Sequence, residues 1–384
     1  MPGPFDPPAA PKSKLGHYRK LSTTAGVHVS PIALGGMSIG DQWDQYGLGS
    51  MNKEDSFRLL NAYFDLGGNF IDTANFYQNE SSEKFIGEWA ESKGIRDQLF
   101  IATKYSGNPK ARDDSVAQKV LYGGTNIKSL HVSVQNSLKY LRTSYIDLLY
   151  VHFWDYDTSI PELMHALHAF VTSHQVLYLG ISDTPAWVVS TANQYARDHA
   201  LTPFSVYQGL WNVTDRSFER DIIPMARYEG MALAPWSVLA EGKIRTDAEE
   251  EARIKNNEVG RTTFSSWLRN DEQKAVCKVL ETVAKEVGAK SIRSVAIAYV
   301  FHKAQYVFPI IGGRKIEHLV SNLEALDISL TDAHLQAIEG AVAFNPGFPH
   351  SMIGNGASNS YFHSVSGKLE FWPLAKPLTP GPQK

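Results

Sequence analysis

The chain has 384 residues, of which 43% are hydrophobic and 20% charged, and its formal net charge is −3. This composition is typical of a soluble globular protein, and a charge so near neutral argues against nucleic acid or an anionic membrane as partner. The apolar runs fall well short of the roughly 20 residues that span a bilayer, and one cysteine, Cys277, favours a reducing, cytoplasmic compartment.

Two segments precede the repeating part of the chain. Residues 1–17 are rich in proline and lack an apolar core, which predicts a flexible N-terminus rather than a secretory signal. Residues 18–32, YRKLSTTAGVHVSPI, favour a β-hairpin with its turn near Gly26. Such a hairpin is well placed to close the floor of a barrel.

Short β-rich segments then alternate with helical patterns. The strand candidates are residues 31–36, 68–74, 99–104, 146–154, 176–182, 204–210, 231–237 and 307–313. The helical candidates are residues 52–67, 82–94, 126–144, 161–174, 184–200, 215–230 and 271–288. Near-continuous apolar strands indicate a parallel sheet covered on both faces. Because no G-x-G-x-x-G or G-x-x-x-x-G-K-[ST] motif occurs, eight such strands favour a closed (β/α)₈ TIM barrel over an open doubly wound sheet.

Three further segments complete the chain. Residues 241–272 are polar and poorly periodic, which predicts a long loop after the seventh strand. Residues 330–343 have the pattern of a capped helix, and we expect the barrel domain to extend over residues 18–345. Residues 346–384 form a C-terminal tail with aromatic residues and prolines. The tail residues that we expect to fold over the barrel mouth are Tyr361, Phe362 and Trp372.

Polar side chains end three successive strand candidates. Asp72 ends the second strand, Lys104 the third and His152 the fourth, and Tyr77 lies one short loop beyond Asp72. In barrel enzymes the active site lies at the C-terminal ends of the strands. Each residue alone could be a cap, an ion-pair partner or a packed core group, but the four together predict a catalytic site.

These segments resemble those of a known enzyme family. IDTANFY around Asp72 and Tyr77, ATK at Lys104 and DLLYVHFWD at His152 are similar, in order, to the tetrad segments of the aldo-keto reductases. The resemblance implies a (β/α)₈ barrel that reduces carbonyls with NADPH and without a metal. It implies that Tyr77 is the general acid, that Lys104 and Asp72 tune it, and that His152 orients the substrate. A phenol has a pKa of about 10, and we expect Lys104 to lower it.

The resemblance also implies a set of cofactor contacts. Ser182 matches the family's Ser-Asn pair, but Asp183 stands where asparagine is usual, which puts one contact with the nicotinamide carboxamide in doubt. Gln208 matches a carboxamide ligand, and Trp236 matches the aromatic residue that stacks under the nicotinamide ring. The residues that match the loop over the pyrophosphate are Ser237, Leu239 and Gly242.

The stretch IIGGRKIEHLVSN gives the strongest phosphate signal. Gly312 and Gly313 allow the backbone to approach a phosphate closely, and Arg314 begins the following helix. By the same resemblance, Arg314 and His318 meet the 2′-phosphate and Asn322 lies at the adenine. Since a guanidinium suits phosphate, NADP is expected in preference to NAD.

Aromatic residues also crowd the expected mouth. The substrate-pocket candidates are Trp43, Tyr46, Phe153 and Trp154. An apolar, aromatic-lined pocket suits a planar aromatic aldehyde. We expect no metal site, because His165 and His168, three residues apart on a helical pattern, have no evident third ligand.

The resemblance leaves three candidate functions for this protein. Within the family, GISDTPAW, GGRKIEHL and the long tail most resemble the fungal aryl-alcohol dehydrogenases, which interconvert aromatic aldehydes and benzylic alcohols. A polyketide-pathway reductase similar to norsolorinic acid reductase is the enzymatic alternative. A channel-associated β subunit is the non-catalytic alternative, which the complete tetrad disfavours. The oligomeric state is not predicted.

Overall fold

The computed structural model describes residue 3, residues 5–260 and residues 266–380. The interpretations of residues 1–17, 241–272 and 346–384 therefore fall partly on residues outside these ranges. No helix within the described ranges is both long enough and apolar enough to cross a bilayer.

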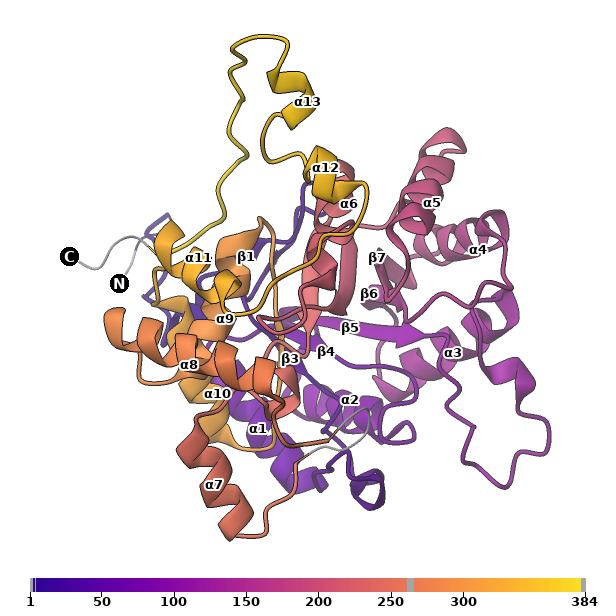
Figure 1. Cartoon of the computed structure of the whole chain (residues 1–384). Coiled ribbons are helices and arrows are strands. Elements are labelled where there is room, and N and C mark those ends of the chain that lie inside the picture. The colour runs from indigo at the N-terminus through magenta and orange to yellow at the C-terminus, as the bar shows by residue number, and fades with distance from the viewer. Residues whose placement is uncertain (1–2, 4, 261–265, 381–384) are drawn as a thin grey trace.

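Eight parallel strands form the centre of the molecule (Figure 1), in the order β10-β3-β4-β5-β6-β7-β8-β9. They are β3 (Ala33–Gly35), β4 (Phe70–Asp72), β5 (Phe100–Tyr105), β6 (Ile146–Val151), β7 (Val176–Ser182), β8 (Val206–Leu210), β9 (Ala232–Trp236) and β10 (Ile310–Gly312). The backbone N–H of Phe308 donates to Leu233 O at 2.8 Å, which joins β9 to the approach to β10 and nearly closes the ring. The predicted (β/α)₈ barrel is confirmed.

Helices surround this ring on its outer side (Figure 1). The helices are α1 (Lys53–Asp65), α2 (Ser81–Lys93), α3 (Ile127–Tyr140), α4 (Ile160–Thr172), α5 (Ala186–Asp198), α6 (Ile222–Glu229), α7 (Asp247–Lys255), α8 (Asp271–Glu286), α9 (Ile292–Lys303), α10 (Ile316–Asn322), α11 (Asp332–Gly340), α12 (His350–Ile353) and α13 (Tyr361–Ser364). The 3₁₀ turns are η1 (Lys14–Gly16), η2 (Asp44–Tyr46), η3 (Arg96–Gln98), η4 (Val120–Tyr122), η5 (Ser217–Glu219), η6 (Ala240–Gly242) and η7 (Leu323–Leu326). Side chains at several N-caps, including Asn52, Asn126 and Ser159, accept first-turn N–H groups and so fix where these helices begin.

The predicted N-terminal hairpin is confirmed and lies at the barrel floor. Its strands β1 (Arg19–Lys20) and β2 (His28–Val29) pair antiparallel. Leu21 and Val29 are fully buried and pack with Phe70, Phe100 and other residues inside the barrel. The hairpin thus seals one end of the barrel interior, while the opposite end carries the polar strand termini.

Helix α9 was missed by the sequence analysis. All residues of α9 from Ser294 to Phe301 are buried, because the helix is covered on every side. A helix without a solvent-facing side has no alternation of apolar and polar residues every 3.6 positions. The pattern that marked the other helices is therefore absent here.

The expectation of a plain loop over residues 241–272 was wrong in part, because α7 lies within it. The side chain of Thr246 accepts the N–H of Glu249 while the Glu249 carboxylate accepts the N–H of Thr246, which forms a capping box. Glu250 is buried and bonded to arginines rather than packed by apolar neighbours. Capping and ion pairing hold this helix, so an apolar stripe did not mark it.

The C-terminal tail leaves the barrel beside α6 and later returns to the floor (Figure 1). The Arg220 guanidinium donates to Asn345 O at 2.8 Å, and Gln305 Nε2 donates to Lys376 O at 2.9 Å. The tail residues that were expected to cover the mouth are exposed: Tyr361 by 73%, Phe362 by 57% and Trp372 by 92%. Cover of the mouth by these aromatic residues stays a prediction.

The described ends of the chain meet at the floor. Leu15 is fully buried, and Lys14 Nζ lies 2.6 Å from an oxygen of Asp327, so this part of the 1–17 segment is packed against the barrel. A small hollow between the two ends is lined by Lys14, His17, Arg19, Leu326, Leu378, Thr379 and Pro380.

Candidate active site

The centre of the site is a buried ion pair at the ends of β4 and β5. Lys104 is fully buried, and its Nζ donates to Asp72 Oδ1 at 2.6 Å and to Thr73 O at 2.7 Å. Gln208, in the middle of β8, donates from Nε2 to Asp72 Oδ2 at 3.0 Å. The side-chain amide that was expected to contact the cofactor thus holds the Asp72 carboxylate in this structure.

Burial and ion pairing shift the pKa values of Asp72 and Lys104 in opposite directions. Burial raises the pKa of Asp72, although Lys104 and Gln208 act to lower it. Burial alone would lower the pKa of Lys104, but Asp72 and Tyr77 outweigh it, so that pKa is raised. Lys104 therefore remains an ammonium ion at neutral pH.

Tyr77 lies over this ammonium at the barrel mouth and is partly exposed. Lys104 Nζ is 5.0 Å from the centroid of the Tyr77 ring. Burial raises the pKa of Tyr77 and outweighs the lowering effect of Lys104. The net lowering expected from the sequence is thus not what the structure shows: Lys104 pulls the pKa in the expected direction, but desolvation of the phenolate is larger.

His152 completes the group. Its ring centroid is 5.8 Å from that of Tyr77 in an edge-on arrangement. Burial, and then the charge of Lys104, hold the pKa of His152 well below its usual range, so the imidazole is neutral. Its Nδ1 is buried and has no hydrogen-bond partner among the described residues. The structure brings Asp72, Tyr77, Lys104 and His152 together, as predicted.

An aromatic wall stands beside Tyr77 and His152. Phe76 lies 5.3 Å from both rings, measured between centroids, and was missed by the sequence analysis although it directly precedes Tyr77. Trp43 lies 6.0 Å from Tyr77, and Phe153, 40% exposed, lies 5.9 Å from His152. These rings form one apolar side of the mouth.

The other two pocket candidates lie differently. Tyr46 stacks against the guanidinium of Arg112, which is 3.7 Å from the ring centroid and comes from the loop after β5. Trp154 packs against Tyr156 and against the core between helices and barrel. Trp154 is thus directed partly into the core.

Asp183 and Trp236 form a second pair at the mouth. Trp236 Nε1 donates to Asp183 Oδ1 at 3.2 Å, and Ser182 Oγ donates to Asp183 Oδ2 at 3.2 Å. Asp183 has a φ of +41°, a left-handed conformation that Asp and Asn tolerate better than most residues. Desolvation by the surrounding barrel mouth raises the pKa of Asp183 to about 6, although the residue is exposed on its outer side.

The turn after β9 has an unusual backbone. Ser237, Ala240 and Glu241 have φ values of +54°, +48° and +56°, and Gly242 follows at +88°. Such left-handed residues cluster at ligand-binding turns. Asn212 Nδ2 donates to Ser237 O at 3.0 Å and helps to hold the turn, while Leu239 packs on the core.

Positive charge gathers beside α10. Burial lowers the pKa of His318, and Lys315, Arg293 and Arg253 lower it further, which shows that these cations act on one region. Arg253 was missed because it lies on α7, in the segment interpreted as a loop. A hollow beside this region is lined by Thr246, Glu249, Glu281, Ala284, Lys285, Lys290, Ser291, Ile292, Arg293 and Ser321.

The remaining phosphate candidates lie nearby: Gly312 ends β10, Gly313 and Arg314 lie in the turn before α10, and Asn322 ends α10. Arg314 packs against Gly49: a Cβ added at Gly49 would lie 3.3 Å from the guanidinium carbon. Open space surrounds Gly313, where an added Cβ would meet nothing within 4 Å, whereas Gly312 ends β10 beside Gly35. Asn322 is buried at the end of α10.

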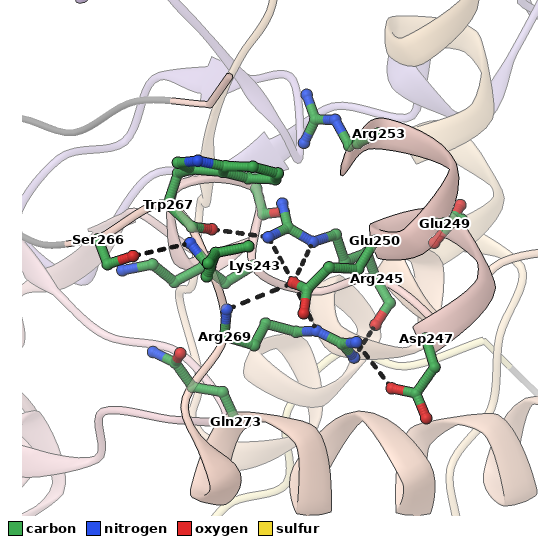
Figure 2. Close-up of polar contacts among 12 residues, drawn as sticks. Lys243, Arg245, Asp247, Glu249, Glu250, Arg253, Ser266, Trp267, Arg269 and Gln273 are labelled. Atoms are coloured by element: carbon green, nitrogen blue, oxygen red, sulfur yellow. Dashed lines mark hydrogen bonds and ion pairs between the residues drawn. The ribbon is translucent and has the colours of Figure 1, made fainter. Parts of the chain in front are cut away.

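A buried ionic network anchors α7 (Figure 2). Glu250 Oε2 accepts from Arg245 Nη2 at 2.6 Å and from Arg269 Nε at 3.1 Å. Arg269 also donates to Arg245 O at 2.6 Å, and the Arg245 guanidinium lies 4.9 Å from the Trp267 ring centroid. The network ties both ends of the segment after β9 together, and so it places Arg253.

No group of three or more potential metal-binding side chains occurs among the described residues. His165 Nε2 instead lies 3.2 Å from Tyr195 OH, and His168 Nδ1 lies 3.0 Å from Thr202 Oγ1.

Comparison with known proteins places the chain in a family. Residues 31–343 match the family model described as aldo/keto reductase family. The chain is 56% identical over 378 residues to an aryl-alcohol dehydrogenase [NADP(+)] of Phanerodontia chrysosporium, a match that covers 97% of this chain and 98% of the relative. It is 52% identical over 351 residues to a putative aryl-alcohol dehydrogenase of Saccharomyces cerevisiae, covering 91% and 93% of the two chains. It is 51% identical over 338 residues to norsolorinic acid reductase B of Dothistroma septosporum, covering 88% and 84%. The chain therefore belongs to the aldo/keto reductase family.

Proposed function

We propose that this protein is an NADP-dependent oxidoreductase that interconverts aromatic aldehydes and aryl alcohols. The observation that carries the proposal is the buried Lys104–Asp72 pair under the accessible Tyr77, with an aromatic wall beside it. The 56% identity to an aryl-alcohol dehydrogenase [NADP(+)] supports both the substrate class and the cofactor.

The residues around the mouth fit NADP. Lys315, Arg293 and Arg253 gather positive charge suited to phosphate around the imidazole of His318, and the space at Gly313 would admit a close approach of the backbone. Trp236, whose indole N–H donates to Asp183 at the end of β7, would stack under the nicotinamide ring. When bound, the cofactor supplies or accepts the hydride.

The chain's own residues would handle the proton. A raised pKa keeps Tyr77 protonated at neutral pH, so its hydroxyl is ready to give a proton to the carbonyl oxygen of an aldehyde. Lys104 then stabilises the phenolate that remains, and Asp72, held by Gln208, keeps Lys104 in position. The neutral imidazole of His152 donates a hydrogen bond to the same oxygen and stabilises its developing charge.

Substitution of Tyr77 by phenylalanine tests this role. We expect turnover of an aromatic aldehyde to fall by about 100-fold or more, because the proton donor is lost, while the dissociation constant for NADPH changes little. Steady-state kinetics and a fluorescence titration with NADPH would measure the two quantities. Tyr228→Phe, at an 85% exposed position on α6, is the matched control. Wild-type turnover by Tyr77→Phe would contradict the proposed role.

The substrate class is tested by a screen of NADPH oxidation. The panel would hold substituted benzaldehydes, aliphatic aldehydes, sugars and quinones, together with aryl ketones, because the 51% identity to norsolorinic acid reductase B makes a polyketide ketone the second candidate. Equal rates across the panel would contradict the aromatic preference. Tight binding of NADP without turnover of any member would instead favour a binding module.

A further inference from the structure

Among the described residues, the charges that act most on Tyr77 come from two carboxylates, Asp72 and Asp183, and one ammonium ion, Lys104. Lys104 is already paired with Asp72 at 2.6 Å. The Asp183 carboxylate receives hydrogen bonds from neutral donors, namely the side chains of Trp236 and Ser182 and the Leu210 backbone, and within the described part of the chain it forms no ion pair. With Asp183 ionised and His152 neutral, this part of the site carries one surplus negative charge.

The surplus charge acts on the reaction centre. The charge of Asp183 influences the pKa of Tyr77, and Lys104 influences that of Asp183, so the three groups share one electrostatic field. The Asp183 backbone N–H donates to Gln208 O at 3.1 Å, which fixes its position beside β8 and directly after the end of β7. A nicotinamide that exchanges hydride with a carbonyl bonded to Tyr77 must lie beside that carbonyl, and therefore in the same field.

We propose that Asp183 sets the preference of this site for oxidised over reduced cofactor. The inference rests on the proposed function, since it requires that NADP(H) binds. The nicotinamide ring carries a positive charge in NADP⁺ and none in NADPH, whereas the rest of the molecule is the same. An ionised Asp183 attracts the charged ring and gives no such gain to the neutral one.

The preference should depend on pH. Burial raises the pKa of Asp183 to about 6, so its charge is present above that pH and lost below it. The ionisable groups that share its surroundings are Lys104 from β5, Tyr77 from the loop after β4 and Tyr207 from β8. Lys104 stays charged, and both tyrosines stay neutral, between pH 5.5 and 8, because their pKa values are raised. The preference for NADP⁺ should therefore grow as the pH rises through about 6.

The test compares dissociation constants of NADP⁺ and NADPH for wild type and Asp183→Asn between pH 5.5 and 8. Tryptophan fluorescence or calorimetry would measure both without turnover. In the ratio of the two dissociation constants, the effects of groups that act on both cofactors alike cancel; His318 and the 2′-phosphate are such groups. We expect the wild-type ratio to shift toward NADP⁺ by roughly tenfold, the size of one partly screened charge pair. Asp183→Asn should show a ratio that does not vary with pH and favours NADP⁺ about tenfold less at pH 8.

Asp41→Asn, at an exposed position on the loop after β3, controls for the loss of one charge and should behave as wild type. A wild-type ratio that is independent of pH, or a shift that persists in Asp183→Asn, would overturn the role of Asp183. Failure of wild type to bind either cofactor would instead overturn the proposed function. Asparagine tolerates the positive φ at this position, so the variant is expected to fold.

Discussion

At the scale of single residues, Glu83 shows how a buried carboxyl group limits stability. Glu83 lies on α2 and is fully buried against β5, where Thr103 Oγ1 donates to its Oε1 at 2.6 Å. Its Oε2 has no hydrogen-bond partner among the described residues. Burial raises the pKa of Glu83 from 4.5 to about 7, so the folded protein favours the protonated form.

The sign of the pH effect follows from this shift. The stabilising contribution is fully present below pH 4.5 and is lost as the pH rises through about 7. Glu83→Gln, which is neutral at every pH, should match wild type near pH 4.5 and exceed its free energy of unfolding by about 3 kcal/mol at pH 8. Thermal or urea unfolding at pH 4.5 and pH 8 would measure the difference.

Glu91→Gln, exposed on the same helix, is the matched control and should show little change at either pH. A Glu83→Gln variant that is no more stable than wild type at pH 8 would show that the carboxyl group gains a compensating partner when it ionises.

At the scale of elements, the Arg245–Glu250–Arg269 network should govern cofactor affinity through α7. Glu250→Gln leaves two buried guanidinium groups without their shared carboxylate, and removal of one partner of a buried pair commonly costs about 3–5 kcal/mol. We expect a lower unfolding temperature and a higher dissociation constant for NADPH, because Arg253 on α7 loses its fixed position. Thermal unfolding and an NADPH titration would measure both.

Glu251→Gln provides a control one residue away on the exposed side of α7. It should leave both quantities near their wild-type values. If Glu250→Gln lost stability but bound NADPH unchanged, the network would support the fold without positioning the cofactor side of the site.

The elements also show why sequence reasoning succeeded in some places and failed in others. The tetrad could be predicted because Asp72, Lys104 and His152 each follow an apolar strand, and parallel strands in a barrel end at one mouth. Helix α9 was missed because burial on all sides removed its periodicity, and α7 was missed because ion pairs hold it. Phe76 and Arg112 contact the site across loops, and no local pattern encodes such contacts. The direction of the Tyr77 pKa shift depended on burial, which a linear sequence does not measure.

At the scale of the whole molecule, catalysis and closure are placed at opposite ends of the barrel. The hairpin seals the floor with Leu21 and Val29, while the tetrad and the cation-rich region around His318 occupy the mouth side. Contacts that secure the fold at the floor are thus separate from those that bind ligands. Substitutions at the hairpin should change stability rather than substrate preference.

The two described ends of the chain meet at that floor, which makes a circular permutation of the chain feasible. Lys14 and His17 line the same hollow as Leu378 and Pro380, so a flexible linker of about ten residues could join residue 380 to residue 13. New ends could then be opened between the exposed Ala117 and Gln118. Such a circular permutant should fold and bind NADPH, as circular dichroism and a titration would show. The site would then depend on the closed ring of strands and not on the order of those strands along the chain.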